Sequence, residues 1–318
     1  MGRHDVSRQS IFFEPNIWLR GNAWEIKAKM NSEFPDLTTM VNYRDDSNPM
    51  NIILGNTQLR NIHYYDIEGG KTFEGKKHSR LNINMGYHQT DNAVAYSLVF
   101  DKQTGVSTVQ PISVNGNYRI DLGIGYTRPL DKKEKLSIDN QASFNYNHNV
   151  DMAMVQGATQ SQRSIVNNWK ISNVLKLNYR LDDNYEFTLH GGGTYYLIKS
   201  QREGFSNIHA GDYNIGVNVQ VALPWKLQLT TDLTMFARRG YQLSEMNTTD
   251  WIWNAQLSRS FINKKLLVKL QGFDILRQLS NTQYLMNAQG RTETWNNSIP
   301  RYVMLSLSWR FNVNPKKK

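Results

Sequence analysis

The chain has 318 residues, of which 39% are hydrophobic, 11% aromatic and 20% charged, and it carries a net charge of +10. Its mean hydropathy is negative and no stretch approaches ~18 consecutive apolar residues, which excludes a transmembrane helix but not a transmembrane β-barrel, whose strands are only half apolar. The absence of cysteine excludes disulfides and thiolate metal sites.

The basic charge does not by itself indicate a nucleic-acid partner. Part of the excess is local, at Lys132, Lys133 and Lys135 and in the tail Lys316 to Lys318. The sequence contains no DNA- or RNA-binding motif and no basic helix. We therefore interpret the charge as scattered solvated residues and expect no nucleic acid.

The first 80 residues predict two strands followed by a long connection. Residues 11–20 and 23–30 carry alternating apolar side chains and are joined by a turn at Gly21 and Asn22. Residues 36–80 are rich in turn-forming residues and predict a loop. A loop of this length in a compact structure indicates a function of its own.

From Leu81 onward, a period of two dominates the sequence. Apolar and polar residues alternate, which is typical of strands with one apolar face and one polar face. Turn signals such as Thr90-Asp91-Asn92 and Leu181-Asp182-Asp183-Asn184 separate the segments. The predicted strands are 81–88, 94–100, 118–127, 136–147, 169–180, 185–197, 213–221, 227–238, 251–257 and 266–270.

The last predicted strand, Tyr302 to Phe311, has the clearest pattern. Its apolar face holds Val303, Leu305, Leu307, Trp309 and Phe311, with Met304, Ser306, Ser308 and Arg310 on the other face. With it the chain has about 13 strands, most near 10 residues, the length of a tilted span of a bilayer. Short turns alternate with long loops, as in outer-membrane barrels.

The aromatic residues favour a membrane barrel over a soluble β-sandwich. Tyrosine and tryptophan gather near both ends of the strands, with isoleucine, leucine and valine between, which is typical of two interfacial girdles. The predicted girdle residues are Tyr126, Tyr179, Tyr185, Trp225, Trp309 and Phe311 at one end and Tyr118, Trp169, Tyr195, Tyr213 and Trp251 at the other. A sandwich would instead bury the stripe Ile215 to Val221 against a second sheet.

Charged residues on the polar faces indicate a water-filled or plug-filled interior, because a protein core would need a partner for each of them. The predicted lumen-facing charges are Asp121, Asp139, Lys170, Lys176, Glu186, Asp232 and Arg238.

No residue pattern indicates an enzyme or a cofactor. The sequence has no phosphate-binding glycine-rich loop, no nucleophile elbow and no zincin motif. Of the seven histidines, His88, His148 and His190 lie on different predicted strands, where they either converge on a metal or simply line the wall. We favour the lining role and expect no metal and no catalytic residues.

The long first loop carries an ordered set of motifs. Phe34-Pro35-Asp36-Leu37 is followed by Asp46-Ser47-Asn48-Pro49-Met50-Asn51-Ile52 and then by Gly55-Asn56-Thr57-Gln58-Leu59. In this order they resemble the Bacteroidota outer membrane β-barrel family, a branch of the TonB-dependent receptors. Thr57 replaces the usual proline, and Asn61 stands where a second proline is common. The closing strand, with its Arg310-Phe311 end, is also similar.

The resemblance spans the whole chain, 1–318, as a single partial barrel domain, and it implies import of a bulky nutrient such as a siderophore, an oligosaccharide or a peptide. Family members also have a signal peptide, a plug and about 22 strands. Met1 to Val6 has no apolar signal segment. We therefore expect a fragment that retains the C-terminal strands and does not transport alone.

The resemblance also implies partners and contact residues. The implied partners are outer-membrane lipid and lipopolysaccharide, the barrel-assembly machinery, an energy-transducing inner-membrane complex acting through a plug, and a surface lipoprotein. The assembly machinery would recognise the closing strand through Leu305, Leu307, Trp309 and Phe311. Substrate contacts would come from loops 36–80, 102–116, 152–164, 201–212, 242–250 and 280–301. Candidate stacking residues there are Tyr64, Tyr65, Phe205, Tyr284 and Trp295.

Two alternatives remain open from the sequence. One is a smaller passive or structural outer-membrane barrel that closes by oligomerisation. The other is a soluble β-rich binding protein, which would be monodisperse without detergent.

Overall fold

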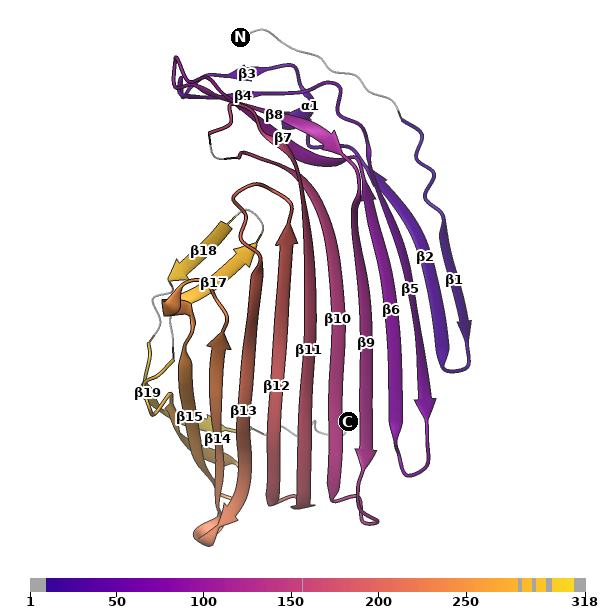
Figure 1. The fold of residues 1–318 in the computed structure, drawn as a ribbon. Coiled ribbons are helices and arrows are strands. Elements are labelled where there is room, and N and C mark those ends of the chain that lie inside the picture. The colour runs from indigo at the N-terminus through magenta and orange to yellow at the C-terminus, as the bar shows by residue number, and fades with distance from the viewer. Residues whose placement is uncertain (1–9, 156, 280–281, 288–289, 296–298, 312–318) are drawn as a thin grey trace, which may run out of the picture.

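The computed structural model describes residues 10–155, 157–279, 282–287, 290–295 and 299–311. Within these residues, 13 strands form one sheet in which every neighbouring pair is antiparallel. The order of the strands in the sheet follows their order along the chain. We call it the large sheet, and Figure 1 shows its strands side by side from β1 to β19. Its strands, in order, are β1 (Asn16–Gly21), β2 (Trp24–Glu33), β5 (Ile62–Glu74), β6 (Arg80–Asp91), β9 (Asn117–Pro129), β10 (Leu136–Ala153), β11 (Gln162–Asp182), β12 (Tyr185–Ser200), β13 (Ile208–Leu223), β14 (Leu227–Arg239), β15 (Thr249–Phe261), β16 (Leu266–Phe273) and β19 (Tyr302–Trp309).

The register of the large sheet joins the apolar faces of neighbouring strands into one surface. Ile171 faces Phe144 on one side and Tyr195 on the other, and Val217 faces Leu189 and Leu233. Because side chains alternate along a strand, a register of this kind keeps these apolar residues on the same side. We call this side the outer face.

The outer face is not covered by a second layer in the described part of the chain. Ile215 is 51% exposed and Val217 41% exposed, in the stripe that a sandwich would bury. Exposed leucine, isoleucine and tryptophan side chains continue along the sheet to Leu305 and Leu307. The alternative of a soluble sandwich is therefore wrong.

The opposite, inner face is polar and crowded. A Cβ atom on Gly123 would come within 2.5 Å of the Asn84 side chain, and one on Gly125 within 2.7 Å of Gln141. These long polar side chains lie flat over the glycines, so the glycines make room for them. Side chains converge on the inside of a curved sheet, and the inner face is accordingly the concave one.

The two ends of the strands differ. Short turns join the strands at the lower end in Figure 1, for example between Gly21 and Trp24 and between Asp182 and Tyr185. The upper end carries the long connections. Two of them supply the strands of a four-stranded sheet in the described residues, which we call the cap: β3 (Arg44–Asp45), β4 (Asn51–Leu54), β8 (Ser107–Val114) and β7 (Ala93–Phe100).

The remaining elements are short. β17 (Thr282–Asn287) pairs with β18 (Gly290–Trp295) in the connection before β19. The helical segments are α1 (Leu37–Met40), η1 (Pro224–Lys226) and η2 (Ser244–Met246). No helix in the described part of the chain is long and apolar enough to cross a membrane.

Two sequence-based assignments are corrected. Residues 36–80, predicted as one loop, contain strand β5, which pairs with β2 and β6 inside the large sheet. Residues 94–100, predicted as a strand of the barrel, belong to β7 of the cap, and β6 pairs with β9 instead. The adjacent glycines Gly69 and Gly70 resemble a turn signal, but both are paired strand residues.

The few fully buried apolar side chains lie toward the upper end. Leu59, in the connection before β5, is 1% exposed, and Met246, in η2, is 0% exposed. Val166, Ile198, Ile208 and Ala210 form a cluster on the upper inner wall. The loops therefore fold inward and pack on the inner face at its upper end, which we call the mouth.

Candidate functional site

A charged network occupies the inner face across four strands, β2, β5, β6 and β9. His88 Nδ1 lies 2.5 Å from Asp66 Oδ1, and its Nε2 lies 3.3 Å from Asp121 Oδ2. Lys29 Nζ lies 3.3 Å from Asp66, and Arg119 Nε donates to Asp121 at 2.6 Å. We call these five residues the His88 network. The arrangement places the imidazole ring between two carboxylates.

The strand pairing explains how these residues meet. Asp66 is the cross-strand partner of both Lys29 and His88, and His88 is the partner of Arg119. The network borders a groove of about 370 Å³ on the same face. Of these five residues, only Asp121 was predicted from the sequence as a lumen-facing charge. The other four lie at positions that alternation also assigns to the inner face, and this is the signal that would have identified them.

The seven predicted lumen charges all lie on the inner face, but the structure spreads them along it. Asp121 joins the His88 network, and Asn145 Nδ2 also donates to it at 2.6 Å. Arg238 lies 3.9 Å from Asp212. Asp139, Lys170, Lys176, Glu186 and Asp232 occupy other positions on the wall. They make the wall polar rather than forming one site.

A second polar group fastens a loop to the upper inner wall. The Tyr241 hydroxyl donates to Asp212 Oδ1 at 2.8 Å. Burial, followed by the hydrogen bond to Asp212, raises the pKa of Tyr241 well above its usual value. Asn247 holds the same loop through its amide, which donates to the Tyr241 carbonyl at 2.9 Å. The loop after β14 is thereby held against the wall instead of standing free.

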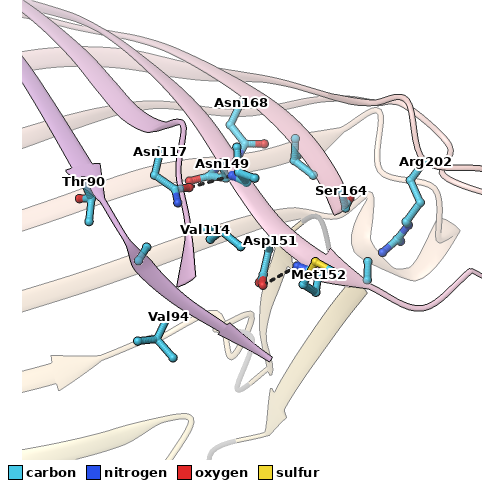
Figure 2. A pocket seen from close by; sticks show the side chains of 14 residues that line it. Thr90, Val94, Val114, Asn117, Asn149, Asp151, Met152, Ser164, Asn168 and Arg202 are labelled. Atoms are coloured by element: carbon cyan, nitrogen blue, oxygen red, sulfur yellow. Dashed lines mark hydrogen bonds between the residues drawn. The ribbon is translucent and has the colours of Figure 1, made fainter. Parts of the chain in front are cut away.

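A cavity of about 460 Å³ opens between the upper inner wall and the cap, at the start of β7 and the end of β8 (Figure 2). Strands β9, β10 and β11 supply its polar side, including Asn117, Asn149 and Asn168. Val94 and Val114 of the cap close it on another side. Asn117 Oδ1 accepts from the Val150 backbone N–H at 2.7 Å, which fixes the top of β10. We call this space the mouth cavity.

The candidate stacking residues are not brought together. Tyr64 and Tyr65 lie in strand β5 and not in a loop, which corrects the prediction; Tyr64 faces inward and donates to the Glu33 carboxylate, and Tyr65 faces outward. Phe205 lies in the expected loop and packs on the upper wall cluster, with the Arg202 guanidinium 5.6 Å from its ring. Tyr284 and Trp295 fall in β17 and β18, and their side chains lie outside the described part of the structure.

The predicted girdle residues lie at the two ends of the outer face. At the upper end Tyr118 contacts the ring of Tyr146, and Tyr146 contacts Trp169 at 5.1 Å between centroids. At the lower end, Trp225 is 76% exposed and Trp309 lies 6.2 Å from Phe311. The closing strand ends at Trp309, so Phe311 stands beyond it rather than within it.

The histidines named as possible metal ligands do not converge. His148 is on the outer face, where it stacks on Tyr118. His88 and His190 face inward on β6 and β12, and β9, β10 and β11 lie between them. Among the described residues, no group of three or more histidine, aspartate or glutamate side chains is arranged to hold a metal ion.

Comparison with known families accounts for this architecture. The model of the outer membrane protein beta-barrel family matches residues 20–196 and, in a second overlapping match, residues 159–309. The chain belongs to the outer membrane protein beta-barrel family. A search of curated proteins finds no match.

Membership places this barrel protein in the outer membrane. This location explains why the isoleucine, leucine and valine side chains of the outer face are exposed. A contiguous apolar surface of this size is unfavourable in water but is covered by acyl chains in a membrane. The upper and lower aromatic residues then mark the two membrane interfaces. The polar face of this outer-membrane barrel protein borders its interior.

Proposed function

We propose that this barrel protein forms the wall of a TonB-dependent importer of the Bacteroidota type, which takes up a bulky nutrient. The observation that supports this most strongly is the inner face. It combines a charged network in the upper half of the wall with loops that fold inward over the mouth. A gated path needs both features, and an inert membrane anchor needs neither. The ordered motifs between Phe34 and Leu59 point to the same branch of receptors. The protein acts as a carrier and not as an enzyme, and it needs no cofactor.

The geometry of the sheet edges supports closure by further strands. The large sheet has 13 strands in the described residues, and every pairing is antiparallel, so β1 and β19 at its edges run in the same direction. Antiparallel closure therefore requires an odd number of additional strands. An open edge in a bilayer would leave its N–H and C=O groups unpaired, at several kcal/mol each.

The same parity argues against a passive barrel made from identical copies. If two copies entered the membrane in the same orientation, β1 of one would meet β19 of the next in a parallel pairing. Bacterial barrels are antiparallel throughout. We therefore favour the importer over the oligomeric passive barrel.

The proposal includes the partners of such an importer. Lipid and lipopolysaccharide surround the outer face, the assembly machinery engages β19 through Leu305, Leu307 and Trp309, and an inner-membrane complex supplies energy through a plug. A surface lipoprotein would cover the cap. Isolated in liposomes, this chain is not expected to give gated uptake.

Whole-cell uptake tests the proposal. In the bacterium that encodes the protein, disruption of its coding sequence is expected to reduce accumulation of labelled siderophores, oligosaccharides or peptides in a screen of these classes. A protonophore should abolish the difference between the two strains, because the importer depends on the proton-motive force. A difference that persists with the protonophore would favour the passive barrel, and the absence of any difference would contradict transport.

A further inference from the structure

We propose that the mouth cavity binds a short peptide with free termini, an assignment that rests on the proposed import function and selects one of its ligand classes. The cavity has about 460 Å³, within the range of ~300–1,000 Å³ that is usual for small-ligand sites. Its lining residues come from the upper ends of β9, β10 and β11 in Figure 1. This end carries the long connections, which face the outside in outer-membrane barrels, so an arriving ligand would meet it first.

The lining offers apolar and amide surfaces side by side. Val94, Val114, Val150 and Met152 give it aliphatic walls. Asparagine amides, which carry one acceptor and two donors, match the C=O and N–H groups of a peptide backbone. Peptides with small aliphatic side chains present this combination of groups.

One amide has an unused acceptor. Asn168, which lines the cavity, has a buried Oδ1 atom without a hydrogen-bond partner among the described residues. A buried carbonyl oxygen left unpaired costs on the order of 1–3 kcal/mol. Rotation of the Asn168 side chain toward the cavity would let a ligand N–H supply the missing donor.

The two charged residues of the lining have opposite signs. Asp151 comes from the end of β10 and Arg202 from the loop after β12. No carboxylate of the described chain lies within salt-bridge distance of Arg202, whose guanidinium instead stacks on Phe205. A carboxylate and a guanidinium in one cavity complement the ammonium and carboxylate ends of a peptide.

The other two ligand classes fit less well. Sugars are held by stacking on aromatic rings, and no described aromatic residue lines the mouth cavity. A strongly anionic ferric siderophore would call for several cations, whereas Arg202 is the only lysine or arginine among the described lining residues.

Titration calorimetry on the full chain in detergent micelles tests the assignment, with the tripeptide Ala-Val-Ala as the probe. Arg202→Gln is expected to weaken binding about tenfold or more, as is C-terminal amidation of the peptide. Amidation should have little further effect on Arg202→Gln, because both changes remove the same interaction. Asp151→Asn and N-acetylation of the peptide form the corresponding pair.

The matched controls are Arg180→Gln and Asp183→Asn. These residues form an exposed ion pair of 2.9 Å at the other end of β11 and in the short turn after it. Both should bind the tripeptide like the wild type. Circular dichroism identifies any variant that fails to fold. In that case, binding of the amidated and acetylated peptides to the wild-type protein tests the assignment.

Each outcome has a separate meaning. Wild-type affinity that is unchanged by amidation and acetylation, or no binding of Ala-Val-Ala at all, overturns the peptide assignment. Protonophore-sensitive uptake of a sugar or siderophore that depends on this protein would also overturn it while leaving the importer intact. Peptide binding together with uptake that is insensitive to a protonophore would support the site and overturn the importer.

Discussion

At the scale of single residues, polar contacts do two kinds of work in this barrel. The His88 network ties the inner sides of β2, β5, β6 and β9 together through charges that each have a partner. The contact of Tyr241 with Asp212 fastens a loop to the wall. Asp66 and His88 of the network are largely buried, so leaving either of them unpaired would be costly.

The pKa of Tyr241 gives a test of the loop anchor. A pKa raised above the usual value near 10 means that folding favours the neutral hydroxyl, so the anchor contributes fully below pH 10 and is lost as the pH rises further. A difference absorbance titration of the wild type against Tyr241→Phe should therefore place this residue clearly above pH 10. After denaturation the same difference should titrate near 10. A value near 10 in the folded protein would mean that the hydroxyl is not held by Asp212.

At the scale of elements, each strand of the large sheet divides its residues between lipid and interior. Val217 and Asn218 are neighbours in β13 and face opposite sides, Val217 toward Leu233 and Asn218 toward Asp232. Both residues are paired with β12 and with β14 in regular register. Only the solvent that each side chain meets is different.

The pair Val217→Lys and Asn218→Lys tests this division. Lysine at position 217 would enter the hydrocarbon and is expected to destabilise the inserted protein by about 2–4 kcal/mol. Lysine at position 218 would enter the polar interior beside Asp232 and should change stability little. Urea unfolding in lipid vesicles measures both. Equal losses at the two positions would contradict the assignment of the faces.

Strands β5 and β7 show that a local pattern predicts a strand but not the sheet to which the strand belongs. Both have strand periodicity, yet β5 is part of the large sheet and β7 is part of the cap. In β5 the glycine pair at 69–70 resembles a turn, although Gly70 pairs with Glu25 and Asn84 in regular register. Membership of a sheet depends on the partner strand, which periodicity does not specify.

At the scale of the whole molecule, the open edges decide what the protein needs in a membrane. β1 and β19 run in the same direction, so they are not suited to close the barrel on each other. The absence of cysteine makes thiol cross-linking a clean measurement.

We expect a short thiol cross-linker to join Val268→Cys to Leu307→Cys, which are cross-strand partners in β16 and β19. The same reagent should not join Ile17→Cys in β1 to Leu307→Cys, either within one chain or between chains, because the proposed additional strands would separate these edges. Gel mobility of the protein in native membranes reports both reactions. An efficient link between positions 17 and 307 would indicate that the two edges meet, and closure by further strands would then be wrong.

The sequence by itself determined that the chain forms amphipathic strands, and it determined which residues lie on the apolar face and which on the polar face of each strand. These properties follow from the period of two, which is local: each side chain's face depends only on its own position along the strand. The seven lumen charges and the exposed stripe at Ile215 and Val217 lie on the faces that alternation assigns to them.

Only the tertiary structure decided which segments become neighbours. It brought Lys29, Asp66, His88 and Arg119 together from four strands, moved residues 94–100 from the wall to the cap, and built the mouth cavity from β9, β10, β11 and the cap. The physical reason is that pairing between strands, and the packing of long loops on a wall, depend on contacts between segments far apart in the chain. A pattern read along one segment carries no record of them.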